Sequence, residues 1–133
     1  MADIVVDTHV VIWYFAEPNR LSPRATETVD DAEANGVIYV SAITVIELIY
    51  LVEKKRIPGD VLDLLRSALS DPATAYQIVG LDRPIADAVQ RIPYHSVPDM
   101  PDRIIAATAL HLNLPLVTRD SQIQSAGLIK TVW

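Results

Sequence analysis

The chain has 133 residues, half of them hydrophobic, no cysteine and a formal net charge of −6. This length fits one domain, residues 1–133, and the lack of cysteine excludes disulfides and thiolate metal sites and favours a reducing, cytoplasmic location. No apolar run reaches the roughly 18 residues that cross a bilayer, Met1-Ala2-Asp3 is no signal peptide, and the acidic balance argues against binding nucleic acid by net charge alone.

Short apolar runs and helical repeats of apolar residues alternate along the chain. The runs predict strands at residues 4–6, 37–40, 76–79, 116–118 and 129–132. The repeats predict helices at residues 8–15, 23–34, 42–54, 60–70, 84–91 and 102–113, and a short one near residue 122. Strands that alternate with helices indicate an α/β fold, a three-layer α/β/α sandwich around a mainly parallel sheet of four or five strands.

Two of these elements carry a further expectation about their place in the fold. Strand 76–79 is more polar than the others, which is typical of a position nearer the sheet edge. Helix 42–54 is apolar nearly all round and is therefore expected in the core.

Acidic side chains stand where a site could form. Asp7 follows the first strand, Asp120 follows strand 116–118, Glu47 lies within helix 42–54, and Asp99 and Asp102 frame the start of helix 102–113. The carboxyl ends of parallel strands are where open α/β sheets bind ligands. Carboxylates held together repel one another, and a divalent cation with a preference for hard oxygen ligands, Mg²⁺ or Mn²⁺, relieves that repulsion.

Helix capping is a competing explanation for most of these acids. Asp7 and Asp120 each stand at a strand-to-helix junction, where an Asp cap is favoured. Asp99, three residues before Asp102, forms a variant capping box. Glu47 lies six residues past the capping Ser41, too far into its helix for this role, and a buried carboxylate needs a partner. Its own competing explanation is a surface glutamate paired with a nearby lysine or arginine, such as Lys54.

Four blocks of sequence resemble the PIN-domain ribonucleases and, more narrowly, the VapC-type toxins of bacterial and archaeal toxin–antitoxin pairs. Their order and spacing carry the resemblance, which extends over the whole chain. The blocks are Asp7-Thr8-His9-Val10-Val11-Ile12-Trp13, Ser41-Ala42-Ile43 with Glu47, Asp99-Met100-Pro101-Asp102-Arg103-Ile104-Ile105-Ala106-Ala107-Thr108-Ala109, and Leu116-Val117-Thr118-Arg119-Asp120.

The resemblance implies a Mg²⁺- or Mn²⁺-dependent endoribonuclease that acts as a toxin and binds a cognate antitoxin. It implies that the catalytic, metal-binding cluster is Asp7, Glu47, Asp102 and Asp120, with Asp99, Thr8 and Thr118 as accessory residues. Ile46 departs from the tryptophan that many relatives carry before the glutamate, which affects packing more than chemistry. The apolar composition separately favours a homodimer.

Basic and histidine side chains complete the candidates. The residues expected to contact the RNA backbone are Lys54, Lys55, Arg56, Arg103 and Arg119. The consecutive residues Lys54, Lys55 and Arg56 also fit a run of solvated surface charges, which is the commoner explanation of such a run. His9, His95 and His111 show no metal-ligand spacing and are expected to serve packing or to lie on the surface.

Two functions of other classes compete with the nuclease. A receiver-like signalling domain also uses an Asp-lined Mg²⁺ site, but it needs a lysine where this chain has Arg119-Asp120, and it has no role for Glu47. A catalytically silent PIN-like module would only bind a partner, but the chain retains all four acids of the cluster.

Overall fold

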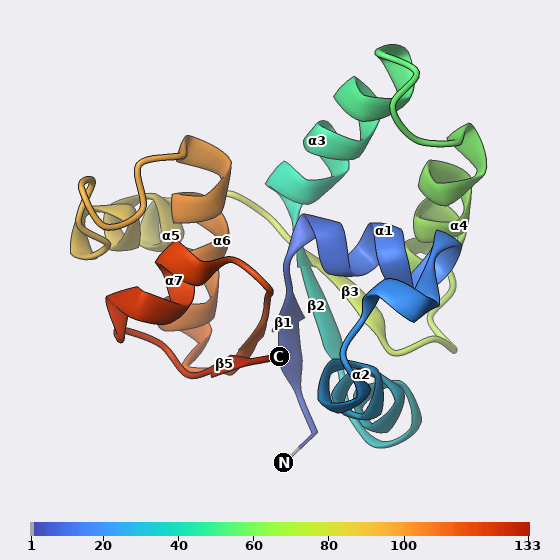
Figure 1. The fold of residues 1–133 in the computed structure, drawn as a ribbon, viewed down its shortest axis with the longest axis horizontal. Helices are drawn as coiled ribbons and strands as arrows, with labels where there is room; N and C mark the ends of the chain where they lie inside the picture. Colours follow the sequence, from blue (N-terminus) through green and yellow to red (C-terminus); the bar gives the residue numbers. More distant parts are fainter. Residues whose placement is uncertain (1) are drawn as a thin grey trace.

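A computed structural model describes residues 2–133 (Figure 1). Five parallel strands form one sheet in the order β3-β2-β1-β4-β5. The strands are β1 (Ile4–Val6), β2 (Ile38–Ser41), β3 (Tyr76–Val79), β4 (Leu116–Val117) and β5 (Thr131–Val132). The predicted α/β class and parallel sheet are confirmed, as is the edge position of the third strand.

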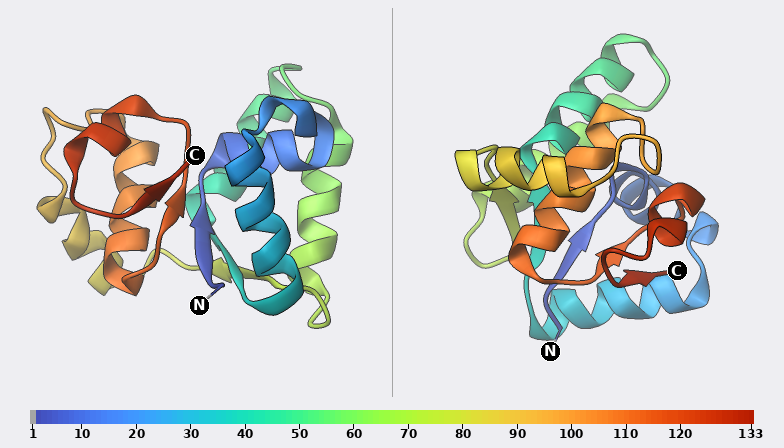
Figure 2. Two further views of the ribbon diagram at one scale, coloured as in Figure 1. Left: turned by 60° about the horizontal axis from the view of Figure 1, so that its bottom comes forward. Right: turned by 90° about the vertical axis from the view of Figure 1, so that its left-hand side faces the viewer.

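Helices cover both faces of this sheet, as the two turned views show (Figure 2). Ile4 and Val6 pack with α1, α2 and α4 on one face, whereas Val5 packs with α6 on the other. Alternate residues of a strand point to opposite faces, so an apolar run buries both and the sandwich has three layers. The helices are α1 (Thr8–Ala16), α2 (Pro23–Asn35), α3 (Ala42–Glu53), α4 (Gly59–Ser70), α5 (Arg83–Ala88), α6 (Met100–Leu112) and α7 (Ser121–Ala126), with 3₁₀ turns η1 (Pro18–Arg20) and η2 (Val89–Arg91).

Most predicted element boundaries agree with the structure to within one or two residues, and the differences have local causes. Helix α6 begins at Met100, before the predicted start at Asp102, because a proline is tolerated in the first helical turn, where its missing N–H is not needed. The predicted helix 84–91 divides into α5 and the tighter turn η2.

The expectation that helix 42–54 lies wholly in the core is wrong. Ile43 and Leu48 of α3 are buried, but Ile46 is 45% exposed and Tyr50 is 58% exposed. Figure 1 shows α3 projecting beyond the end of the sheet, and Ile46 and Tyr50, four residues apart, share the face of this helix that is left exposed. No helix within residues 2–133 is long and apolar enough to cross a membrane.

Candidate active site

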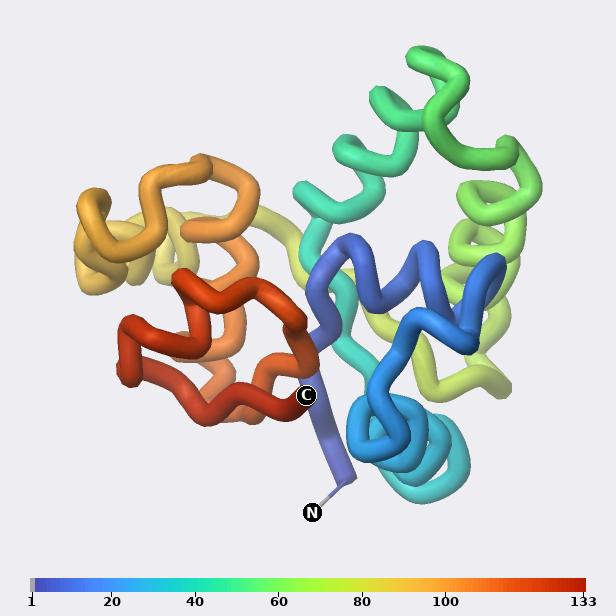
Figure 3. The backbone as a smooth tube through the Cα atoms, viewed as in Figure 1, coloured from blue at the N-terminus to red at the C-terminus, as the bar shows by residue number. Residues whose placement is uncertain are grey.

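The two central strands bring distant parts of the chain together. Strand β4 lies beside β1, with Val117 paired to Val6, and the backbone tube shows the C-terminal segment next to the first strand (Figure 3). Their carboxyl ends therefore place Asp7 and Asp120 at the same edge of the sheet. The N-terminal end of α6 adds Asp102.

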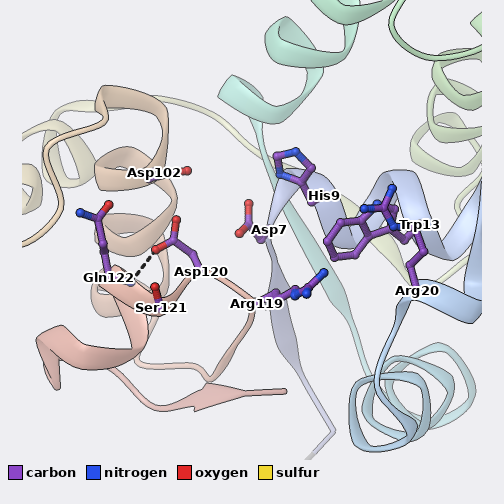
Figure 4. Close-up of a pocket in the computed structure, with 9 residues that line it drawn as sticks. All are labelled: Asp7, His9, Trp13, Arg20, Asp102, Arg119, Asp120, Ser121 and Gln122. Atoms are coloured by element: carbon purple, nitrogen blue, oxygen red, sulfur yellow. Dashed lines mark hydrogen bonds between the residues drawn. The ribbon is translucent and has the colours of Figure 1, made fainter.

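These three carboxylates line an opening with a volume of about 590 Å³ (Figure 4). That volume is within the range of small-ligand sites. In Figure 4, Asp102 and Asp120 lie on one side of Asp7, and the basic and aromatic side chains lie on the other. The remaining lining residues are His9, Trp13, Arg20, Arg119, Ser121 and Gln122.

Asp7 is buried at the base of this arrangement. The Thr118 hydroxyl donates to Asp7 Oδ2 over 2.6 Å. Burial raises the pKa of Asp7, while the Thr118 bond and the nearby His9 oppose the rise. The carboxylate makes no capping bond to helix α1, so the capping explanation is wrong for this residue.

The capping explanation is correct for Asp120, but only one oxygen of its carboxylate makes the capping bonds. Asp120 Oδ1 accepts from the backbone N–H groups of Gln122, at 2.8 Å, and Ile123, at 3.0 Å. Both bonds are made by one oxygen, which leaves Oδ2 available to a ligand. The backbone N–H of Asp120 donates to Thr118 Oγ1 over 3.0 Å, so one threonine orders two acids.

Asp99 and Asp102 also form the predicted cap, since Asp99 Oδ2 accepts from the Asp102 N–H at 3.1 Å. The cap uses only the backbone N–H of Asp102, and the half-buried side chain of this residue lines the opening. Its pKa is raised from 3.8 to about 8, first by burial and then by the charges of Asp7, Asp99 and Asp120. Such a shift is typical of carboxylates crowded at a functional site.

Glu47 is held by a chain of hydroxyl groups. Thr8 Oγ1 donates to Glu47 Oε1 over 2.6 Å and lies 2.9 Å from Thr44 Oγ1. A hydroxyl has one proton, so Thr44 donates to Thr8, and Thr8 donates to the carboxylate. Burial and the charges of Asp7 and Asp99 raise the pKa of Glu47.

The surface pairing proposed for Glu47 is wrong. The ion pairs within residues 2–133 join Arg20 to Glu17 and Arg83 to Asp87. Glu47 does not line the opening, but it lies near enough to Asp7 for the charge of that acid to raise its pKa.

The acids do not enclose a ready-made metal cage, because no three acidic or histidine side chains of residues 2–133 are grouped as an ion site. Their chemistry still fits Mg²⁺ or Mn²⁺. Mg²⁺ is usually held by one or two carboxylates and several waters, and does not need an all-protein cage. Burial is the first cause of the raised pKa values of Asp7, Glu47 and Asp102, and neighbouring carboxylates add to it. A bound cation would favour the charged form of each acid.

The predicted basic residues divide into two groups. Arg119 lines the opening. Arg103 does not, because its guanidinium donates to the backbone carbonyls of Ile92, at 2.6 and 3.1 Å, and Val89, at 3.0 Å, and so fixes the segment before α6. The three residues of the turn after α3 are exposed and do not line the opening; they are Lys54, Lys55 and Arg56.

Four of the lining residues were not predicted from the sequence, namely Trp13, Arg20, Ser121 and Gln122, and His9 was given no role at the site. His9 is exposed, and its ring centroid lies 5.6 Å from that of Trp13. The two residues are four apart on α1, so helical spacing from Asp7 could have placed both beside the acid. Arg20 follows in the turn η1, for which no spacing rule gives a position.

Comparisons with known proteins match this chain along nearly its whole length. The family model described as PIN domain matches residues 4–128. Ribonuclease VapC22 of Mycobacterium tuberculosis is 34% identical over 135 residues that span all of both chains. FitAcB of Neisseria gonorrhoeae has a TM-score of 0.63 and 27% identity, covering 96% of this chain and 95% of that chain. VapBC2 of Rickettsia felis, bound to a promoter DNA fragment, shares the fold, with a TM-score of 0.73, 16% identity, and coverage of 97% and 96%.

Proposed function

The chain belongs to the PIN-domain family, and we propose that it is a Mg²⁺- or Mn²⁺-dependent endoribonuclease, the toxin of a toxin–antitoxin pair. The observation that carries the proposal is the opening lined by Asp7, Asp102 and Asp120, which come from three separate elements. Ribonucleases of this family depend in general on a divalent metal. The same activity is supported by the similarity to Ribonuclease VapC22, which matches along the entire length of both chains.

Each acid has a distinct part in the proposed site. Asp7 and Asp102 are the direct ligands of the ion, and Glu47 and Asp120 either complete its shell or orient the attacking water. A bound divalent ion would lower the pKa of a water molecule that it binds, and it would offset the charge that develops on the reacting phosphate.

The threonines serve as positioning residues in this proposal. Thr118 fixes Asp7 Oδ2, so the other oxygen of Asp7 is the one directed to a ligand. Thr8 fixes Glu47 Oε1 in the same way. A hydrogen bond to the charged form of a carboxylate favours ionisation, which a cation ligand requires.

An antitoxin partner belongs to the proposal. Solved neighbours include VapBC2 of Rickettsia felis and a toxin–antitoxin complex of Klebsiella pneumoniae. Exposed apolar side chains such as Ile46 and Tyr50 are suited to a protein contact. The homodimer stays a prediction, and the receiver-like alternative is set aside because the chain is a PIN-domain protein.

The experiment that tests the nuclease uses purified protein freed of any partner and incubated with total cellular RNA. Wild type, Asp7→Asn and the surface control Asp63→Asn are compared with Mg²⁺, with Mn²⁺ and with EDTA. We expect cleavage by wild type and by the control, in the presence of metal only. Equal cleavage by Asp7→Asn would contradict the proposed site. Absence of cleavage, together with absence of metal binding in calorimetry, would favour the catalytically silent module.

A further inference from the structure

Two arginines lie against one tryptophan at the side of the opening away from Asp102 and Asp120 (Figure 4). The guanidinium carbon of Arg20 lies 4.8 Å from the centroid of the Trp13 ring, and that of Arg119 lies 5.9 Å from it. The distances are those of cation–π contacts. We call Arg20, Trp13 and Arg119 the basic rim.

The basic rim is held on a rigid support. Trp13 is only 7% exposed, and the ring of Trp133 contacts it edge-on at a centroid distance of 5.9 Å. A guanidinium stacked on a fixed ring loses side-chain freedom before any ligand arrives. The indole therefore holds two cations at the opening, and less side-chain entropy is lost when a ligand binds to them.

The basic rim keeps most of its positive charge, because Arg20 has one exposed acidic partner and Arg119 has none within residues 2–133. Arg119 takes part in no ion pair within residues 2–133, although it precedes Asp120 in the chain and shares the opening with three carboxylates. Arg20 contacts Glu17 at 3.3 Å, with both side chains about half exposed, a type of pair that contributes little in water. Two like charges held at one ring favour an anion between or beside them.

We propose that Arg20 and Arg119 bind a phosphodiester of the RNA next to the one that is cut, and so position the strand across the acids. This inference rests on the proposed ribonuclease function. The opening has one acidic side, which suits a cation, and one basic side, which suits a phosphate. Arginine matches phosphate oxygens in a bidentate geometry, and local cations are needed because the whole chain carries a charge of −6.

Binding measured without turnover tests this inference directly. Asp7→Asn protein in EDTA is titrated with fluorescent single-stranded RNA by anisotropy at several salt concentrations. Arg20→Gln and Arg119→Gln are added singly to that background, and Arg66→Gln, on the exposed surface of α4, removes the same charge away from the opening. Each rim variant is expected to reduce the slope of log K against log salt by about 0.7, the value for one phosphate contact in a single strand. Arg66→Gln is expected to leave the slope unchanged.

Turnover provides a second readout on proteins with Asp7 intact. The rim variants are expected to raise KM several-fold with little change in kcat, because the contact is remote from the reacting phosphate. Arg119→Lys is expected to restore the salt slope, since it keeps the charge, but to recover only part of KM, since it loses the planar fork.

The outcomes separate the basic rim from the nuclease. If wild type cuts RNA and the rim variants match it in slope and KM, the inference is overturned while the nuclease stands. A wild type that cuts nothing counts against the nuclease, and the slopes measured on the Asp7→Asn protein still decide whether the rim binds phosphate. Equal losses of slope in the rim variants and in Arg66→Gln would also overturn the inference, because they would show a general charge effect.

Discussion

Asp102→Asn is expected to stabilise the protein while it abolishes cleavage. In the folded chain the pKa of Asp102 is raised to about 8 by burial and by the surrounding acids. The folded state therefore holds the proton more tightly than the unfolded state, and stability is lost as the pH rises from about 4 through 8. Asparagine keeps the shape of the side chain and removes the charge that causes this loss.

The size of the effect follows from the same shift. At 1.36 kcal/mol per pKa unit, the rise sets an upper bound of roughly 5–6 kcal/mol. Asp102 is only half-buried, and screening by water and salt reduces this to roughly 1–2 kcal/mol at pH 8. A gain of that size raises Tm by about 3–8 °C in a domain of this length.

Thermal unfolding of wild type, Asp102→Asn and Asp63→Asn at constant ionic strength between pH 4 and 8 measures the effect. Asp63 is exposed on α4, so its variant reports the effect of net charge alone. The Tm difference between Asp102→Asn and wild type should be small near pH 4 and largest at pH 8. Mg²⁺ should raise the Tm of wild type more than that of Asp102→Asn. A variant less stable than wild type at pH 8, or a difference that does not change with pH, would refute the reasoning.

Three further changes address the supporting contacts. Thr118→Val removes the hydroxyl that donates to Asp7, so the pKa of Asp7 should rise further. Calorimetry should then show a fall in Mg²⁺ affinity on the order of tenfold. Thr118→Ser keeps a hydroxyl and is the control, with the pKa of Asp7 and the Mg²⁺ affinity expected to stay as in wild type. Glu47→Gln keeps an oxygen for the Thr8 hydroxyl, so Tm should fall by no more than about 2 °C while cleavage of RNA drops; a large loss of Tm would assign Glu47 a structural role. Arg103→Ala removes the donor to the Ile92 carbonyl and one of the two donors to the Val89 carbonyl, which keeps the Ile92 N–H. It should lower the free energy of unfolding in urea by about 2 kcal/mol, and an unchanged midpoint would contradict the structural role given to this arginine.

Local signals in the sequence predicted the elements of this fold well. The predicted start of helix 23–34 is the observed start of α2, where Ser22 Oγ accepts from the Ala25 N–H at 3.0 Å and Pro23 occupies the first turn. Alternation of apolar runs with helical repeats predicted a parallel sheet, because parallel strands need a crossover between them. These features depend on residues close in sequence, which is why a single chain is enough to predict them.

Features that depend on distant residues were harder to predict. Apolar spacing says that a helix has an apolar face but not what covers it, and so the exposure of Ile46 and Tyr50 was missed. The capping pattern of Asp7 is the same whether or not Thr118 lies beside it, and only the pairing of β4 with β1 gives the carboxylate a different partner. The basic rim joins α1, a 3₁₀ turn and the residue after Thr118, which no local pattern connects.

The bond between Thr118 and Asp7 joins residues 111 positions apart, and it ties the site to the order in which the chain is made. Contacts of such long sequence separation form only after the intervening chain is available. A growing polypeptide therefore has Asp7 and Glu47 early, but lacks Asp120 and the hydroxyl that orients Asp7 until residues 118–120 have been synthesised. The acidic site is incomplete before that point, so a shorter nascent chain is spared the activity that we propose for the folded protein.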